Sequence, residues 1–305
     1  MSQQIKILDG GMGRELARIG APFRQPEWSA LALYEAPERV REVHDSFIAA
    51  GAEAITTNSY AVVPFHIGDD RFARDGARLA ALAGKLAREA ADAAASPVRV
   101  AGSLPPALGS YRPDLFNLAQ AQAIHRVLVD AQAPWVDLWL GETISSIAEA
   151  ESINAVLAGQ PQPLWLSFTL QDEPELYDAV STLRSGESVS AAVTRAIELG
   201  AENVLFNCSH PEVMSSAVKQ AAAVRKQLGA DIGIGVYANA FEHGSNSGGA
   251  NEGLSGMRKD THPEGYLNWA QEWVAAGATL IGGCCGIGPE HIGRLASALK
   301  SPGDR

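Results

Sequence analysis

The sequence has few cysteines, few basic residues and no long apolar run, and each scarcity excludes a class of protein. Three cysteines cannot all pair with one another, which argues against a disulfide-rich secreted domain. Lysine and arginine number 24 against 35 acidic residues, and the net charge of −11 disfavours binding to nucleic acid or anionic membranes. No apolar run approaches the roughly 18 residues of a membrane span, and the N-terminus lacks the regions of a signal peptide. These features predict a cytoplasmic protein with no membrane or nucleic-acid partner.

Short apolar runs of β type recur eight times along the chain. They are Ile5–Leu8, Ala54–Thr57, Val98–Gly102, Val136–Leu140, Leu164–Thr169, Asn203–Phe206, Ile232–Val236 and Thr279–Ile281. Segments with helical periodicity or alanine-rich composition lie between them. These segments are Pro37–Ala50, Gly76–Ala95, Leu118–Ala131, Ile144–Leu157, Val189–Leu199, Pro211–Leu228, Pro263–Ala276 and Pro289–Leu299.

Eight strands that alternate with helices are typical of a (β/α)8 TIM barrel of the α/β class. The competing fold is an open doubly wound sheet, which usually has fewer strands and a glycine fingerprint after its first strand. We predict the barrel, as a single domain over residues 1–305. A Gly/Ser-rich insertion at about 243–256 follows the seventh strand, and a mobile lid and a flexible surface insertion are equally good interpretations of it.

All three cysteines follow predicted strands: Cys208 the sixth, and Cys284 and Cys285 the eighth. Active sites of (β/α)8 barrels lie at these carboxyl ends. Three thiolates can hold Zn²⁺ and leave the fourth tetrahedral position open for substrate, and the flanking glycines permit the sharp turn that adjacent ligands need. An all-sulfur ligand set suits activation of a thiol better than activation of water. A redox switch or vicinal disulfide is the alternative for the adjacent pair, and a buried apolar role is the alternative for Cys208 alone.

Other polar residues also follow predicted strands. The first strand ends in Asp9–Gly13, the second in Thr56–Tyr60 and the fourth in Gly141–Thr143. The glycine-rich turn at Asp9–Gly13 lacks the Lys and Ser/Thr of a phosphate-binding P-loop, so phosphate binding is disfavoured. The seven histidines show no metal-ligand spacing, which indicates surface or structural roles.

Several of these motifs together resemble the homocysteine S-methyltransferase family. They are Leu8–Gly13, Thr57–Tyr60, Gly141–Thr143 with Glu149–Ala150, Asn207–Cys208, and Gly283–Gly286 followed by Ile287–Ile292. The resemblance spans about residues 5–299. It implies a zinc-bearing (β/α)8 barrel that methylates L-homocysteine to methionine.

The resemblance also implies roles for individual residues. Cys208, Cys284 and Cys285 would be the Zn²⁺ ligands. Asp9 with the Gly10 backbone, and Glu142, would hold the α-amino group of the substrate. Thr56 and Asn58 are further candidates for substrate contacts. The segment Ala238–Glu242 departs from the family pattern near the expected donor site, so these motifs do not select the methyl donor.

The resulting hypothesis is direct methyl transfer, in which the homocysteine thiolate attacks the methyl group of a cationic donor. S-methylmethionine is the first choice of donor, and S-adenosylmethionine a substitute. A betaine-like donor, a corrinoid protein or another thiol acceptor would be alternatives within the family. A zinc hydrolase would want His or carboxylate ligands, which the all-cysteine set disfavours. A non-catalytic zinc or thiol sensor is the alternative from another class.

Overall fold

The structure is a computed structural model that describes residues 4–242 and 256–300. Eight parallel strands form its centre: β1 (Lys6–Ile7), β2 (Ala54–Thr56), β3 (Arg99–Leu104), β4 (Leu138–Ile144), β5 (Leu164–Phe168), β6 (Asn203–Asn207), β7 (Gly233–Tyr237) and β8 (Leu280–Ile281). Each strand pairs with the next along the chain from β2 to β8, and β8 pairs with β1. A parallel bridge between Leu8 and Ala54 joins the first strand to β2, so the sheet closes on itself. The predicted (β/α)8 barrel is thereby confirmed.

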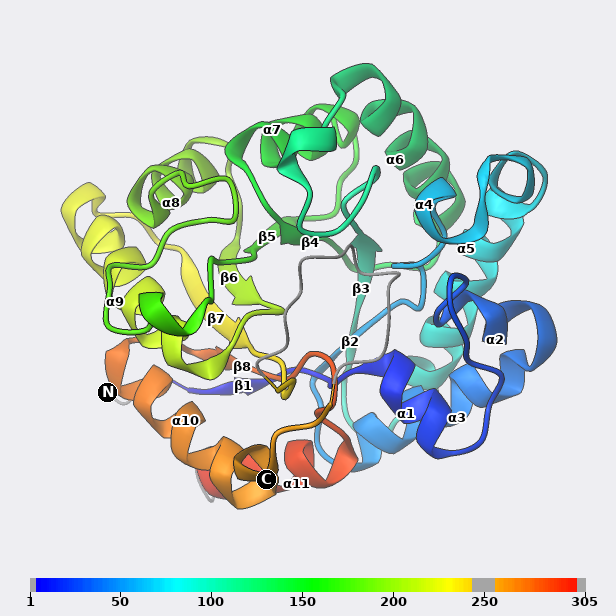
Figure 1. Cartoon of the computed structure of the whole chain (residues 1–305). Helices are drawn as coiled ribbons and strands as arrows, with labels where there is room; N and C mark the ends of the chain where they lie inside the picture. The colour runs from blue at the N-terminus through cyan, green and yellow to red at the C-terminus, as the bar shows by residue number, and fades with distance from the viewer. Residues whose placement is uncertain (1–3, 243–255, 301–305) are drawn as a thin grey trace.

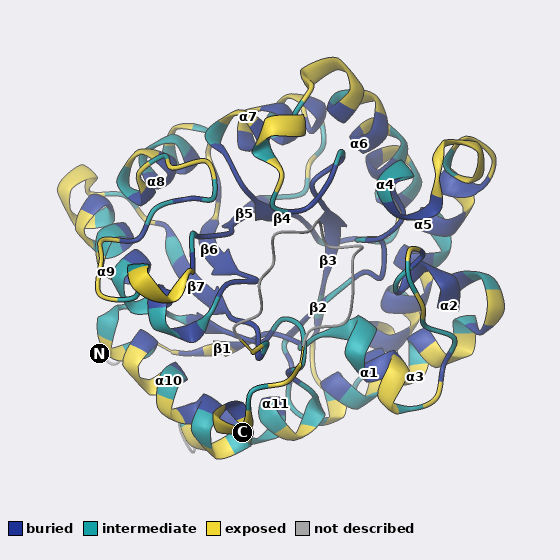
Figure 2. Ribbon diagram, in the orientation of Figure 1, coloured by how far each residue is buried: buried dark blue, intermediate teal, exposed yellow. Residues whose placement is uncertain are grey.

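Helices surround the strands as a ring (Figure 1). They are α1 (Met12–Arg18), α2 (Ala30–Glu35), α3 (Pro37–Ala49), α4 (Pro64–Ile67), α5 (Asp69–Asp92), α6 (Leu118–Gln132), α7 (Ile147–Val156), α8 (Val189–Glu198), α9 (Pro211–Leu228), α10 (Pro263–Ala276) and α11 (Pro289–Leu299). Their inner faces are buried against the strands and their outer faces are exposed (Figure 2). None of the described helices is long and apolar enough to cross a membrane.

The apolar core has two layers, as the alternation of side chains along each barrel strand requires. The larger layer lies between the strands and the helices and includes Phe47, Trp139, Phe206 and Trp273. The smaller layer fills the interior of the barrel. It consists of Leu8, Ala54, Ala101, Leu138, Leu140, Trp165, Leu205, Tyr237 and Leu280, with Cys284 packed against it. The interior is therefore a packed core, and the cysteines lie next to it.

The predicted segment boundaries were wrong at one important place. Ile144 was assigned to a helix, but it is the last residue of β4. Helix α7 begins later because Ser146 and Glu149 form a capping box, in which the Ser146 hydroxyl accepts from Glu149 N and the Glu149 carboxylate accepts from Ser146 N. Helices α1, α2 and α4 were not predicted, and α5 begins at Asp69 rather than Gly76. The predicted insertion at about 243–256 lies, except for Gly256, outside the described residues.

Candidate active site

The three cysteines meet at the carboxyl end of the barrel. Cys208 follows β6, and Cys284 and Cys285 follow β8, which is separated from β6 by β7 alone. Their sulfur atoms all lie within 4.8 Å of one another. Cys208 and Cys284 are joined as a disulfide, and Cys285 is a free thiol. The bond therefore links two strand ends, and the adjacent pair Cys284–Cys285 is not bonded to itself.

Backbone geometry brings the adjacent cysteines to one point. Gly286 has a φ of +86°, a left-handed conformation that favours glycine, and Ile287 N donates to Cys284 O to close the turn. The turn lies against the Gly10–Gly11 segment: Gly11 N donates to Ile287 O at 2.9 Å. A side chain at Gly11 would meet the Cys284 carbonyl oxygen at 2.5 Å. The glycine-rich segment after the first strand therefore allows close backbone approach to the cysteine turn.

The cysteine cluster fits a zinc ion by both spacing and chemistry. Tetrahedral Zn–S bonds of about 2.3 Å place sulfur atoms about 3.8 Å apart. The three sulfur atoms lie within 4.8 Å of one another, and reduction of the Cys208–Cys284 disulfide would let that pair separate to the distance that zinc requires. Burial raises the pKa of the Cys285 thiol to about 11, with the Arg14 guanidinium opposing that rise and the Glu142 carboxyl adding to it. A thiol in this position needs a bound cation to ionise near neutral pH. The reduced cluster is thus suited to a divalent metal.

Asp9 lies two residues after β1, and its carboxylate is nearly buried. Thr56 N donates to Asp9 Oδ2 at 2.7 Å, and the Thr56 hydroxyl donates to Oδ1 at 3.4 Å. Burial is the main cause that raises the Asp9 pKa to about 8; the nearby Glu142 carboxyl contributes to the rise, and the hydrogen bonds from Thr56 oppose it. In this structure Thr56 therefore orients Asp9.

Glu142, in β4, is the second nearly buried carboxylate of the site. The Ser103 hydroxyl donates to Glu142 Oε1 at 2.5 Å, and the Tyr237 hydroxyl donates to Oε2 at 3.2 Å. Burial raises the pKa of Glu142, and these two hydrogen bonds lower it. Two buried carboxyl groups that repel each other attract a positively charged ligand group.

Gly10 and Asn58 differ from these residues in what surrounds them. A side chain at Gly10 would meet Ile287 O and the Phe47 ring, so glycine is required by packing. The Asn58 amide donates to the Ser29 carbonyl at 3.0 Å and is nearly buried, which anchors the segment before α2. Their contacts with a substrate remain predictions.

Comparison with known proteins agrees with this geometry. Residues 6–299 match the family described as homocysteine S-methyltransferase. The homocysteine S-methyltransferase of Escherichia coli K12 is 34% identical, over 96% of this chain and 94% of that protein. The chain belongs to the homocysteine S-methyltransferase family.

Solved structures extend the agreement to the fold. The metallated form of the homocysteine methyltransferase MmuM from Escherichia coli has a TM-score of 0.76 at 29% identity, covering 97% of this chain and 96% of that one. The oxidized form of the same enzyme has a TM-score of 0.77 at 28% identity, with the same coverage. As a member of the homocysteine S-methyltransferase family, this protein is an enzyme that transfers a methyl group to homocysteine.

Several residues that support the family site were missed by sequence reasoning. Ser103 and Tyr237 hydrogen-bond to Glu142, and they lie near the carboxyl ends of β3 and β7. Tyr60 and Tyr111 lie close enough to Cys285 for its charge to raise the pKa of both phenols, although burial is the larger cause. Strand-end position could have revealed Ser103 and Tyr237, whereas Tyr111 lies in a long connection with no such signal.

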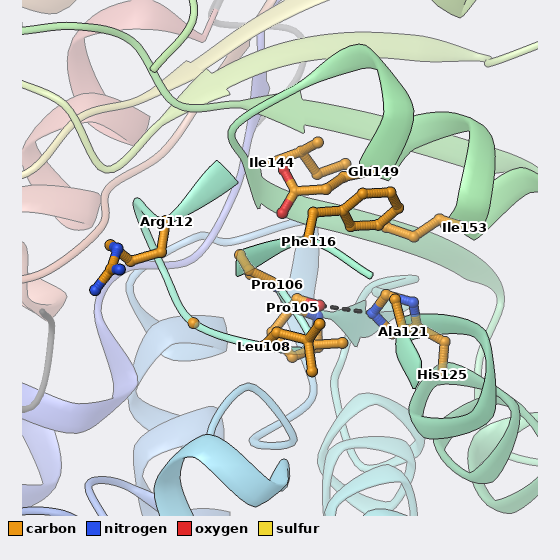
Figure 3. Close-up of a pocket in the computed structure, with 12 residues that line it drawn as sticks. Pro105, Pro106, Leu108, Arg112, Phe116, Ala121, His125, Ile144, Glu149 and Ile153 are labelled. Carbon is orange, nitrogen blue, oxygen red and sulfur yellow. Dashed lines mark hydrogen bonds between the residues drawn. The ribbon is translucent and has the colours of Figure 1, made fainter. Parts of the chain in front are cut away.

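The histidines take structural positions where they approach the site. His210 follows Cys208 by two residues, and its ring bonds to Asp172 O and the Tyr177 hydroxyl, each at 3.1 Å. His125 lines a cavity of about 10 Å³ between the segment after β3 and helices α6 and α7, and its ring bonds to Pro105 O at 2.7 Å (Figure 3). This cavity is about the size of one water molecule and contains none of the predicted site residues.

Proposed function

We propose that this enzyme moves a methyl group from a sulfonium donor to the thiol of L-homocysteine, with Zn²⁺ held by Cys208, Cys284 and Cys285. S-methylmethionine is the proposed donor and S-adenosylmethionine a substitute. The observation that carries the proposal is the meeting of three cysteine sulfurs within 4.8 Å at the carboxyl end of the barrel, beside two buried carboxyl groups. Membership of the homocysteine S-methyltransferase family supports the acceptor.

Asp9 and Glu142 are proposed to bind the α-ammonium group of homocysteine. Both carboxyl groups are nearly buried, and burial raises both pKa values, so a cation between them recovers favourable electrostatic energy. Thr56 fixes the Asp9 carboxylate, and Ser103 and Tyr237 fix Glu142. These hydrogen bonds set the orientation of the substrate before its sulfur reaches the cysteine cluster.

Reduced Cys208, Cys284 and Cys285 would hold the metal. When bound, Zn²⁺ supplies a position at which the substrate thiol is deprotonated near neutral pH while remaining nucleophilic. The homocysteine sulfur then forms a bond to the donor methyl carbon as the bond from that carbon to the donor sulfur breaks. The positive charge on the donor sulfonium is lost with the methyl group, so no base acting on carbon is required.

The surroundings of the cysteines suit a cationic donor. Tyr60 and Tyr111 are near enough to Cys285 for its charge to raise the pKa of both phenols, and aromatic faces attract sulfonium and ammonium cations. Asp9 and Glu142, when ionised, add negative potential to the same end of the barrel. We propose that the donor methyl approaches from the side of these tyrosines.

The test is a methyl-transfer assay with homocysteine and a panel of donors, on reduced, zinc-loaded protein and on chelated protein. S-methylmethionine should give methionine, and activity should fall at least a hundredfold on chelation or in Cys208→Ser. Activity only with a betaine-like donor or a corrinoid protein would replace the proposed donor. Stoichiometric zinc without transfer from any donor would favour a sensor.

A further inference from the structure

Strand β4 has an irregularity at Glu142, the residue whose carboxylate is proposed to bind the substrate ammonium group. In its pairing with β5, Gly141 lies opposite Leu166 and Ile144 opposite Phe168, so three steps along β4 match two along β5. Glu142 and Thr143 occupy this bulge. Bulges leave a backbone group unpaired in the ladder and redirect a side chain. Here the redirected side chain is Glu142.

Asn207, the last residue of β6, hydrogen-bonds to the polar groups that this bulge leaves unpaired in the sheet. Its Oδ1 accepts from Thr143 N at 2.9 Å, and its Nδ2 donates to the Thr143 hydroxyl at 2.9 Å. Its Oδ1 also accepts from the Ser167 hydroxyl at 2.8 Å. All three residues are fully buried. The Asn207 amide therefore binds both the backbone N–H and the side-chain hydroxyl of Thr143 in β4.

Thr143, which contacts Asn207, and Cys208, which follows Asn207, both have unusual backbone conformations. Thr143 has a φ of +57° and Cys208 a φ of +48°, which non-glycine residues rarely adopt and which cluster at functional sites. Thr143 directly follows Glu142, and Cys208 directly follows Asn207. One buried amide thus lies between the carboxylate and the cysteine of the site.

From this geometry we infer that Asn207 is a positioning residue, which holds Thr143 in its left-handed conformation and so sets Glu142 relative to Cys208. The inference rests on the proposed function, because it assigns Glu142 to the substrate ammonium and Cys208 to the metal. Without the amide, Thr143 N–H would be buried and unpaired, and the bulge would relax toward an ordinary strand. Glu142 would then turn away from the position that Ser103 and Tyr237 define.

The test compares Asn207→Ala with Asn203→Ala, a substitution of another buried asparagine at the other end of the same strand. On reduced protein, the Kd of L-methionine is measured by calorimetry and zinc affinity by competition with a chromophoric chelator. Asn207→Ala should weaken methionine binding at least tenfold and zinc binding at least fivefold. Asn203→Ala should change each less than twofold. The KM for homocysteine should rise at least tenfold in Asn207→Ala.

A second background separates positioning from general stability. Glycine adopts a positive φ without steric cost, so in Thr143→Gly the hydrogen bonds from Asn207 are less necessary to hold residue 143 in its left-handed conformation. Asn207→Ala should therefore cost less than threefold in methionine affinity when made in Thr143→Gly. Equal losses in both backgrounds, or equal losses in Asn207→Ala and Asn203→Ala, would overturn the inference. If Asn207→Ala does not fold, Asn207→Asp is tested instead, because its side chain keeps the acceptor for Thr143 N. This variant should retain methionine affinity within threefold. A tenfold loss of affinity in Asn207→Asp would also overturn the inference. Failure of the proposed function would instead appear as absent methyl transfer in the unmodified enzyme.

Discussion

At the scale of single residues, the chemistry of the site depends on groups whose protonation is altered by burial. The Asp9 carboxyl has a pKa of about 8, because burial and the neighbouring Glu142 outweigh two hydrogen bonds from Thr56. Near pH 7 the unliganded protein therefore keeps most of Asp9 protonated. An ammonium ligand requires the ionised form, so binding is coupled to release of a proton.

This coupling predicts a pH dependence of ligand binding. The Kd of L-methionine, which has no ionisable thiol, should fall roughly tenfold as the pH rises from 6.5 to 8, with proton release detected by calorimetry in two buffers. Asp9→Asn cannot ionise, so its Kd should be weaker and nearly independent of pH over that interval. An unchanged pH dependence in Asp9→Asn would show that another group titrates.

A second residue-scale prediction concerns Gly11. A methyl group there would lie 2.5 Å from the Cys284 carbonyl oxygen, a backbone atom that cannot move without displacing the cysteine turn. Gly11→Ala should cost about 2 kcal/mol in the free energy of unfolding and weaken zinc binding. Gly293→Ala is the matched control, since its nearest neighbour would be Ala50 O at 3.9 Å, and it should be neutral or slightly stabilising. Chemical denaturation and chelator competition measure the two effects, and equal behaviour of the two variants would contradict the account.

At the scale of secondary-structure elements, the segment from β4 to α7 contains both the site residue Glu142 and the capping residues of α7, Ser146 and Glu149. Glu149 accepts from the backbone N of Ser145 and Ser146, at 2.7 and 3.0 Å, and caps α7. Burial nevertheless raises its pKa to about 7. A carboxyl group that holds its proton more tightly in the folded state favours folding below its unfolded pKa of about 4.5, and this advantage is lost as the pH rises to about 7.

Glu149→Gln should therefore alter the pH dependence of stability. The free energy of unfolding of the variant, relative to that of the unmodified protein, should increase by up to about 3 kcal/mol as the pH rises from 4.5 to 7.5. Urea denaturation at several pH values measures this difference. A constant difference across the range would mean that Glu149 ionises normally in the folded protein.

The elements also show what sequence patterns can and cannot predict. The eight apolar runs predicted all eight strands, because buried parallel strands are short, apolar and bounded by turns. The end of β4 was misassigned because Ile144 continues both an apolar strand and an apolar helix, and only the Ser146–Glu149 capping box decides between them. The positions of the cysteines, Asp9 and Glu142 could be predicted because each lies in the last residues of a strand or within a few residues after its carboxyl end. Asn207 could not be given its role, because its partners Thr143 and Ser167 come from other strands and pair with it only in three dimensions.

At the scale of the whole molecule, Cys208 and Cys284, which we propose as metal ligands, lie at two strand ends and are 76 residues apart in sequence. A metal that binds only the folded protein raises its stability by mass action, by about 2.7 kcal/mol at a hundredfold excess over Kd. Under reducing conditions, zinc should raise the melting temperature by roughly 5 °C. Cys208→Ser and Cys285→Ser should each lose most of that shift, as measured by scanning calorimetry. A full shift in both variants would place the zinc elsewhere.

In the proposed reaction, a reduced, zinc-loaded cysteine cluster activates homocysteine toward a sulfonium donor. A decisive measurement follows an isotopically labelled methyl group from S-methylmethionine into methionine, with zinc-loaded, chelated and Cys285→Ser protein side by side. We expect label in methionine with the zinc-loaded protein and at least a hundredfold less with the other two. Undiminished transfer after complete removal of zinc would contradict it.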